Sequence, residues 1–283
     1  VVGLLPRGEI GIFGPSCPEP AGDSDQIFRQ SGGHLEPVAV RRLSGRQAPM
    51  GAAVGDIDGD GVFDLVVTLN PEVAIYRGTG DGYEPAWSAV TESSGNWPQI
   101  PWGVAILDIN QDGLQDLVVA NGNDHSAVED AQRFGDGKGF SPGPQHVVLW
   151  INQGGFRFAD ATVSVGLDVR GQFQGIAVGD LDDDGDPDFI VGGIGDKPRV
   201  WRNEITGEGA ASVRFSPPVI GATVEVAGQV HYTGGVLSPY ALSEPMVFAS
   251  LGPVAEAPIR ITLPTGRVAH GTIRPGANLI PLE

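Results

Sequence analysis

The sequence has little of what disulfide-bonded, membrane-spanning and nucleic-acid-binding proteins need. Its single cysteine, Cys17, cannot form an internal disulfide, and cysteine usage therefore does not reveal the cellular compartment. Only 17 residues are Lys or Arg against 35 Asp or Glu, and the net charge of −18 argues against nucleic acid, because phosphate backbones require a basic surface. No run of about 20 apolar residues occurs, so we expect no membrane span.

Helical periodicity and the common catalytic motifs are also missing. No long segment repeats apolar residues at helical spacing, whereas the chain has 43 glycines and 23 prolines. Short apolar runs between glycine and proline turns predict an all-β fold. Neither a Gly-Xaa-Ser-Xaa-Gly nucleophile elbow nor a phosphate-binding loop is present, which favours a binding protein over an enzyme.

Three acidic segments, starting at Asp56, Asp108 and Asp180, follow one pattern. Each has oxygen-bearing side chains at positions 1, 3, 5 and 9 and a glycine at position 6. Alternate side chains converge when the backbone coils around an ion, the glycine permits the sharp turn, and oxygens are the ligands that calcium prefers. We therefore predict three Ca²⁺ sites, in which position 7 contributes its backbone carbonyl. The predicted ligands are Asp56, Asp58, Asp60, Val62, Asp64, Asp108, Asn110, Asp112, Leu114, Asp116, Asp180, Asp182, Asp184, Asp186 and Asp188.

These acid loops differ from EF-hands, which need a bidentate Glu at position 12 and flanking helices. Position 12 is Val67, Val119 or Val191, and the residues after each loop are β-branched and apolar, as in strands. Each loop is thus expected to join two buried strands. The alternative is that Asp-Gly clusters only mark tight hairpins; three copies with one acid spacing favour calcium.

Each acid loop lies in a longer repeat of strand, loop, strand, strand, turn and strand. Four strands at a period of about fifty residues are typical of a propeller blade. The second copy is lengthened by residues 121–145, either a binding loop on a rigid scaffold or a solvated insertion. Residues before 50 read as a degenerate copy without the acids, where we expect no ion. We predict propeller blades over 1–202 and a small β-sandwich or barrel over 203–283.

The acid repeats resemble the FG-GAP/VCBS family, whose members form β-propellers. In the tail, Trp201-Arg-Asn-Glu, Ile220-Gly-Ala-Thr-Val, Ser250-Leu-Gly and Leu263-Pro-Thr-Gly resemble the ASPIC/UnbV domain of the cartilage acidic protein 1-like family. The resemblance implies an extracellular or periplasmic calcium-binding protein, secreted with its signal peptide removed. Two departures stand out: Leu263 replaces a family tryptophan, and we count three clear blades and one degenerate blade where family propellers have about seven.

Two classes of function remain. The first is a scaffold or adhesion protein, stiffened by structural calcium, that binds a protein or glycan or is a subunit of a larger assembly. The alternative is an enzyme (a lyase, cyclase or hydrolase) that uses the propeller cavity, since acids from separate blades can converge there. Among the three loops we expect the second to bind calcium most weakly, because Asn110 replaces a carboxylate.

Overall fold

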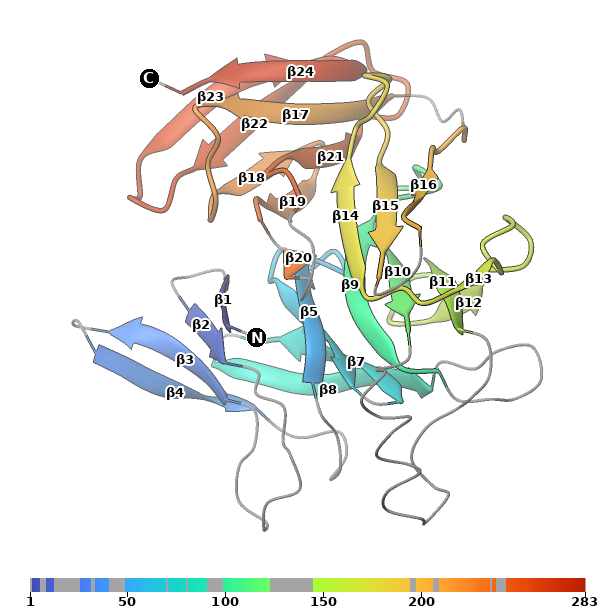
Figure 1. The fold of residues 1–283 in the computed structure, drawn as a ribbon. Coiled ribbons are helices and arrows are strands. Elements are labelled where there is room, and N and C mark those ends of the chain that lie inside the picture. The colour runs from blue at the N-terminus through green and yellow to red at the C-terminus, as the bar shows by residue number, and fades with distance from the viewer. Residues whose placement is uncertain are drawn as a thin grey trace, which may run out of the picture.

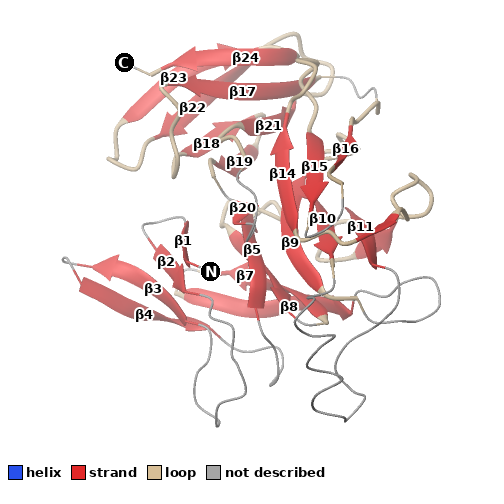
Figure 2. Ribbon diagram, viewed as in Figure 1, coloured by secondary structure: helices blue, strands red, loops and turns tan. Residues whose placement is uncertain are grey.

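The structure is a computed structural model of the chain. It describes residues 2–5, 9–12, 26–31, 34–40, 49–69, 71–79, 81–90, 99–122, 145–193, 197–205, 209–234, 236–237 and 243–282. These residues form strands and loops without a helix (Figure 2), so they contain no helix that could span a membrane. The sheets are arranged as propeller blades followed by C-terminal sheets (Figure 1), and the predicted all-β propeller class is confirmed.

Two blades have the four antiparallel strands that the repeat predicts. The first consists of β5 (Pro49–Gly55), β6 (Asp64–Leu69), β7 (Glu72–Gly78) and β8 (Gly82–Val90). The second consists of β9 (Pro101–Leu107), β10 (Asp116–Asn121), β11 (Gln145–Asn152) and β12 (Phe158–Asp160). A two-residue strand, β13 (Arg170–Gly171), pairs with the start of β11.

The third blade is shorter, and the first copy is joined to its neighbour. The described strands of the third blade are β14 (Gly175–Gly179), β15 (Asp188–Gly192) and β16 (Arg199–Trp201). The N-terminal strands are β1 (Val2–Leu5), β2 (Glu9–Ile12), β3 (Gln26–Ser31) and β4 (His34–Val40). They form an antiparallel meander, and β4 pairs in parallel with β8, so that the degenerate copy and the first blade share one sheet.

The blades pack face to face through apolar side chains. Both β6 and β10 are buried along their whole length, which explains their unbroken apolar runs. One apolar cluster joins Val66 and Ile75 of the first blade to Leu117 and Trp150 of the second. A second cluster joins the opposite face of the second blade to the third, around Phe173. Each such buried side chain contributes roughly 1.5–3 kcal/mol to folding, so the blade interfaces hold the acid loops in fixed positions.

The C-terminal segment, which we call the tail, forms two sheets. The first contains β17 (Ala210–Ser216), β21 (Val247–Ser250) and β24 (Gly276–Pro281). The second contains β18 (Thr223–Val226), β19 (Gln229–Tyr232), β22 (Ala257–Thr262) and β23 (Val268–Ile273). Inward side chains of both sheets share one apolar cluster, and β22 alternates buried and exposed residues as its sequence predicts. The predicted boundary at residue 203 stays a prediction.

The tail also joins the propeller directly. The two-residue strand β20 (Val236–Leu237) pairs with β5, on the inner edge of the first blade. In Figure 1, β20 lies between β19 and the end of β5, and the end of β14 reaches the level of β21. The tail thus sits over the edge at which the three acid loops leave β5, β9 and β14.

Candidate metal sites at the acid loops

Loop 1 connects β5 to β6 and coils as a metal-binding loop does. Gly61, at position 6, has φ +82°, a left-handed conformation that glycine adopts without strain. Its N–H donates to Asp56 Oδ2 (3.0 Å), while the N–H of Val62 donates to Asp60 Oδ1 (2.8 Å). Position 6 has positive φ in the other two loops as well. The glycine requirement read from the sequence is therefore confirmed.

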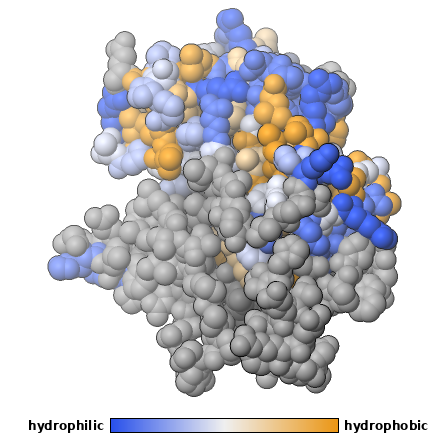
Figure 3. All heavy atoms as spheres, viewed as in Figure 1, coloured by the Kyte–Doolittle hydropathy of each residue, from blue (hydrophilic) through white to orange (hydrophobic). Residues whose placement is uncertain are grey.

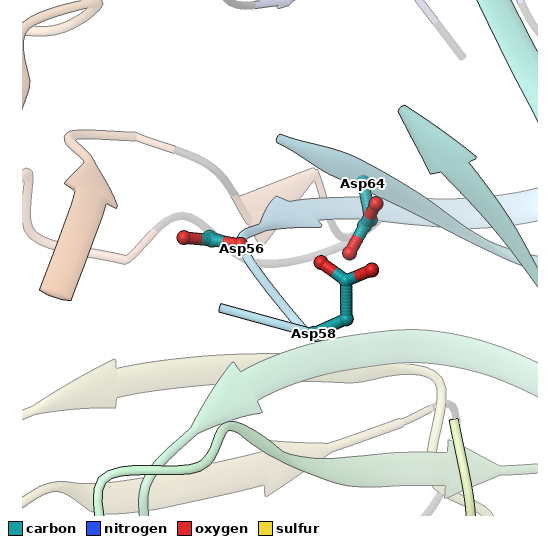
Figure 4. A group of neighbouring side chains, drawn as sticks. All are labelled: Asp56, Asp58 and Asp64. Atoms are coloured by element: carbon teal, nitrogen blue, oxygen red, sulfur yellow. The ribbon is translucent and has the colours of Figure 1, made fainter. Parts of the chain in front are cut away.

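Loops 1 and 3 each bring three carboxylates together. Oxygens of Asp56, Asp58 and Asp64 lie within 4.8 Å of one another, and the same holds for positions 1, 3 and 9 of loop 3. These loop 3 residues are Asp180, Asp182 and Asp188. In Figure 4 the carboxylates of Asp58 and Asp64 face each other, with Asp56 to one side. Such groups can hold a cation, because a single ion would relieve the mutual repulsion of three negative charges.

Two buried carboxylate oxygens at these groups favour a cation over a simple hairpin. Asp56 and Asp180 are 7% and 4% exposed, and Oδ1 of each has no hydrogen-bond partner among the described residues. A buried acceptor without a partner costs free energy. An ion that takes these oxygens as ligands would remove that cost at both loops, so the residues present fit a hard cation.

Burial, with a smaller effect of neighbouring charges, raises the pKa values of two loop acids. Burial, reinforced by nearby Asp58 and Asp56, raises the pKa of Asp64 to about 7. Burial and the charges of neighbouring loop aspartates raise the pKa of Asp186 to about 8. A bound cation would reverse these shifts by favouring the charged form. Asp186 was predicted to contribute its backbone carbonyl, yet its side chain is itself buried and its Oδ1 lacks a partner among the described residues.

The aspartate at position 9 has a structural role that sequence reasoning missed. Asp64 Oδ2 accepts the N–H of Ile57 in its own loop (2.9 Å), and its Oδ1 accepts the N–H of Gly78 at the end of β7 (2.8 Å). Asp116 and Asp188 repeat this pair of hydrogen bonds in the second and third blades. Position 9 thus ties each loop to the third strand of its own blade.

Loop 2 is arranged differently. Asp108 Oδ1 accepts the N–H of Asp112 (3.0 Å), and the amide of Asn110 donates to Asp112 Oδ2 (2.9 Å). Among the described residues, no three acids of loop 2 come as close together as those of loops 1 and 3. The structure therefore brings together positions 1, 3 and 9 in two of the three predicted ligand sets. The carboxylates of Asp60 and Asp184, the carbonyls of Val62, Leu114 and Asp186, and all the ligands of loop 2 stay predictions.

Arginines accompany the loops that have aspartate at position 3. Arg77 contacts Asp58 (Nε–Oδ2, 2.9 Å) and Asp60 (Nη2–Oδ2, 2.7 Å) from β7. Arg202, which follows β16, contacts Asp182 (3.3 Å). The equivalent position of the second blade is Ile151, where the loop has Asn110 instead of aspartate. The third strand of a blade thus has or is followed by an arginine where the loop has aspartate at position 3, and has a neutral residue where the loop has asparagine.

Asparagines connect loops 1 and 2 to the next blade. Asn152 Nδ2 donates to the carbonyl of Ile57 in loop 1 (3.0 Å), and Asn203 Nδ2 donates to the carbonyl of Ile109 in loop 2 (2.9 Å). In the first blade the equivalent residue is Gly78, where a Cβ would lie 2.2 Å from a backbone oxygen. Alignment of the copies through Trp150-Ile-Asn152 and Trp201-Arg-Asn203 is the sequence signal that reveals these asparagines.

The tail contributes hydroxyl groups to loops 2 and 3. Ser250 Oγ donates to Asp108 Oδ2 (2.5 Å), and Ser212 Oγ donates to Asp180 Oδ2 (2.5 Å). In both cases the acceptor is the position 1 aspartate, on the oxygen that also accepts the N–H of the position 6 glycine. The side chain of Arg214 adds a hydrogen bond to the carbonyl of Asp180 (2.8 Å). The tail therefore completes the surroundings of two loops.

Comparison with known proteins supports the repeat. Residues 20–67 match the family of FG-GAP-like repeats, a stretch that includes β3, β4, β5 and the whole of loop 1. No curated protein matches the chain. The repeat and the blade arrangement together support an FG-GAP propeller, while the ASPIC/UnbV resemblance of the tail stays a prediction. Residues 123–144 of the long second-copy loop lie outside the described residues, so its suggested binding role is also untested.

Proposed function

We propose that this protein is a calcium-stabilised propeller scaffold that acts outside the cytoplasm by binding a protein or glycan. The observation that carries the metal part is the pair of three-carboxylate groups with buried, unpartnered oxygens at Asp56 and Asp180. All the donors are oxygens on loops that coil around one point, which suits calcium better than magnesium, because magnesium retains most of its water. The FG-GAP-like repeat, typical of extracellular proteins, supports the location.

Calcium in this proposal is structural. Bound at loops 1 and 3, it would hold together carboxylates that otherwise repel each other on a rigid strand framework. The ion would bind the folded chain and not the unfolded one, so it would stabilise folding through mass action. The loops in turn support the tail, since Asp180 accepts a hydrogen bond from Ser212 and Asp108 accepts one from Ser250.

The enzyme alternative has one supporting feature, a cavity that both Asp56 and Asp108 line. Burial raises the pKa of both carboxyl groups. Both residues, however, occupy position 1 of an acid loop, where their oxygens accept the N–H of the position 6 glycine. This geometry supports a ligand role for the two carboxylates more than acid–base catalysis.

Thermal unfolding in CaCl₂ and in EGTA tests the metal. Calcium at a hundred times its dissociation constant stabilises a one-site protein by about 2.7 kcal/mol. We expect a higher melting temperature in calcium, a smaller rise with Asp182→Asn, and an unchanged rise with Asp168→Asn, an exposed aspartate outside the loops. An equal rise in all three proteins would exclude Asp182 as a calcium ligand, and no rise in the wild type would exclude stabilising calcium at both loops.

A further inference from the structure

A cavity of about 150 Å³ lies where the tail covers loop 1. Its walls come from the ends of β5, β9 and β14 on the propeller side and from β19 and the start of β21 on the tail side. Asp56 and Gln115 line it together with the apolar residues Val178, Val230 and Phe248. The cavity therefore combines a few polar groups with apolar walls, as small-molecule sites do.

Among the described residues, no hydroxyl donates to the position 1 aspartate of loop 1, whereas a tail serine does so at loops 2 and 3. At loops 2 and 3, Oδ2 of the position 1 aspartate accepts both a glycine N–H and a tail serine hydroxyl. At loop 1, Asp56 Oδ2 accepts the N–H of Gly61, and among the described residues no hydroxyl reaches it. Asp56 and Gly59 of loop 1 both line the cavity.

The remaining groups of the cavity define the ligand. Gln115 Oε1 has no hydrogen-bond partner among the described residues, so this oxygen is a second acceptor at the cavity. The described lining contains three carboxylates, of Asp56, Asp108 and Glu244, and no lysine or arginine, which disfavours an anionic ligand. Tyr232 and Phe248 supply aromatic wall, against which the C–H face of a sugar packs.

We propose that this cavity binds the terminal pyranose unit of a neutral glycan, with a ring hydroxyl donating to Asp56 Oδ2 as Ser250 and Ser212 do at the other loops. A second hydroxyl donates to Gln115 Oε1. The inference rests on the proposed binding function and names its ligand class. The face of the tail seen in Figure 3 mixes hydrophobic and hydrophilic residues. This face therefore suits a flat apolar partner less well than the cavity suits a sugar.

Saturation-transfer NMR with methyl pyranosides of glucose, galactose, mannose and N-acetylglucosamine, in calcium buffer, tests the cavity. We expect a signal from at least one glycoside with the wild type and its loss with Val230→Trp, which fills the cavity. The matched control is Val268→Trp, a tail valine on β23 that does not line the cavity, and it should retain the signal. Gln115→Met, which removes one acceptor at constant length, should weaken it.

The outcomes separate this inference from the proposed metal function. No signal from the wild type, or a signal that survives in folded Val230→Trp, overturns the sugar site even where calcium raises the melting temperature. If Val230→Trp does not fold, an undiminished signal in Gln115→Met overturns it. A glycoside signal that the cavity variants abolish, in a protein that calcium does not stabilise, supports the sugar site and removes calcium from the proposed function.

Discussion

Replacing Asn152 by alanine should destabilise the contact between the first two blades. Asn152 is 1% exposed, and its side-chain amide donates to the carbonyls of Ile57 and Gln115, both at 3.0 Å. A buried carbonyl that loses its donor costs about 1–3 kcal/mol. Two carbonyls, one of them only partly buried, give an expected loss of roughly 2–4 kcal/mol in the free energy of unfolding.

The matched control is Asn203→Ala in the next blade. Both asparagines accept a backbone N–H through Oδ1, from Gly154 and Ile205 respectively, but Asn203 donates to one loop carbonyl instead of two. We therefore expect Asn203→Ala to cost about half as much.

Urea denaturation in saturating calcium measures both variants. In a thermal scan the melting temperature of Asn152→Ala should fall by about 4–16 °C, given about 2–4 °C per kcal/mol for a domain of this size. An Asn152→Ala protein within about 0.5 kcal/mol of the wild type, which is the range of ordinary surface substitutions, would refute the reasoning. So would a larger loss in Asn203→Ala, because it would show that the loop carbonyls do not determine the cost.

Three further predictions concern the tail and loop 2. Ser212→Ala removes a fully buried hydroxyl bonded to a carboxylate and should cost about 1.5–3 kcal/mol in urea denaturation; Ser164→Ala, at an exposed hydroxyl, is the control. Burial lowers the pKa of His231 to about 4, so between about pH 6.5 and 4 the unfolded chain binds a proton that the folded chain does not, and stability is lost as the pH falls through this range. The His231→Gln protein should therefore lose less stability than the wild type between pH 7 and 5. An equal loss in the two proteins would contradict this prediction. Asn110→Asp should tighten calcium binding in calorimetry, and adding Ile151→Arg should reverse the gain; unchanged affinity would contradict both.

The strands and loops followed from the sequence because their causes are local. The unbroken apolar runs of β6 and β10 need burial on both faces, and a blade between two other blades provides it. Position 6 has positive φ in all three loops, as at Gly113 with φ +87°, and this conformation favours glycine. Alternation in β22 marked a sheet with one buried face. Each of these signals lies within a few consecutive residues.

The contacts between tail and propeller could not be read in the same way. Ser250 and Asp108 are 142 positions apart, and neither the spacing nor the type of a serine indicates which aspartate it reaches. The strand β20 has two residues, too few to show a period, yet it pairs with β5. Long-range docking depends on complementary surfaces, and one sequence without its relatives carries no record of which surfaces meet.

Charge alone does not make loop 2 the weakest site. Loop 1 has four aspartates and Arg77, whereas loop 2 has three aspartates and the neutral Ile151, so both sites have a formal charge of −3. The two loops differ in the hydrogen bonds that the position 1 carboxylate accepts. Asp56 Oδ1 has no partner among the described residues, while both oxygens of Asp108 already accept hydrogen bonds, one of them from Ser250. A cation at loop 2 must share or displace these donors, which is why we still expect loop 2 to bind calcium most weakly.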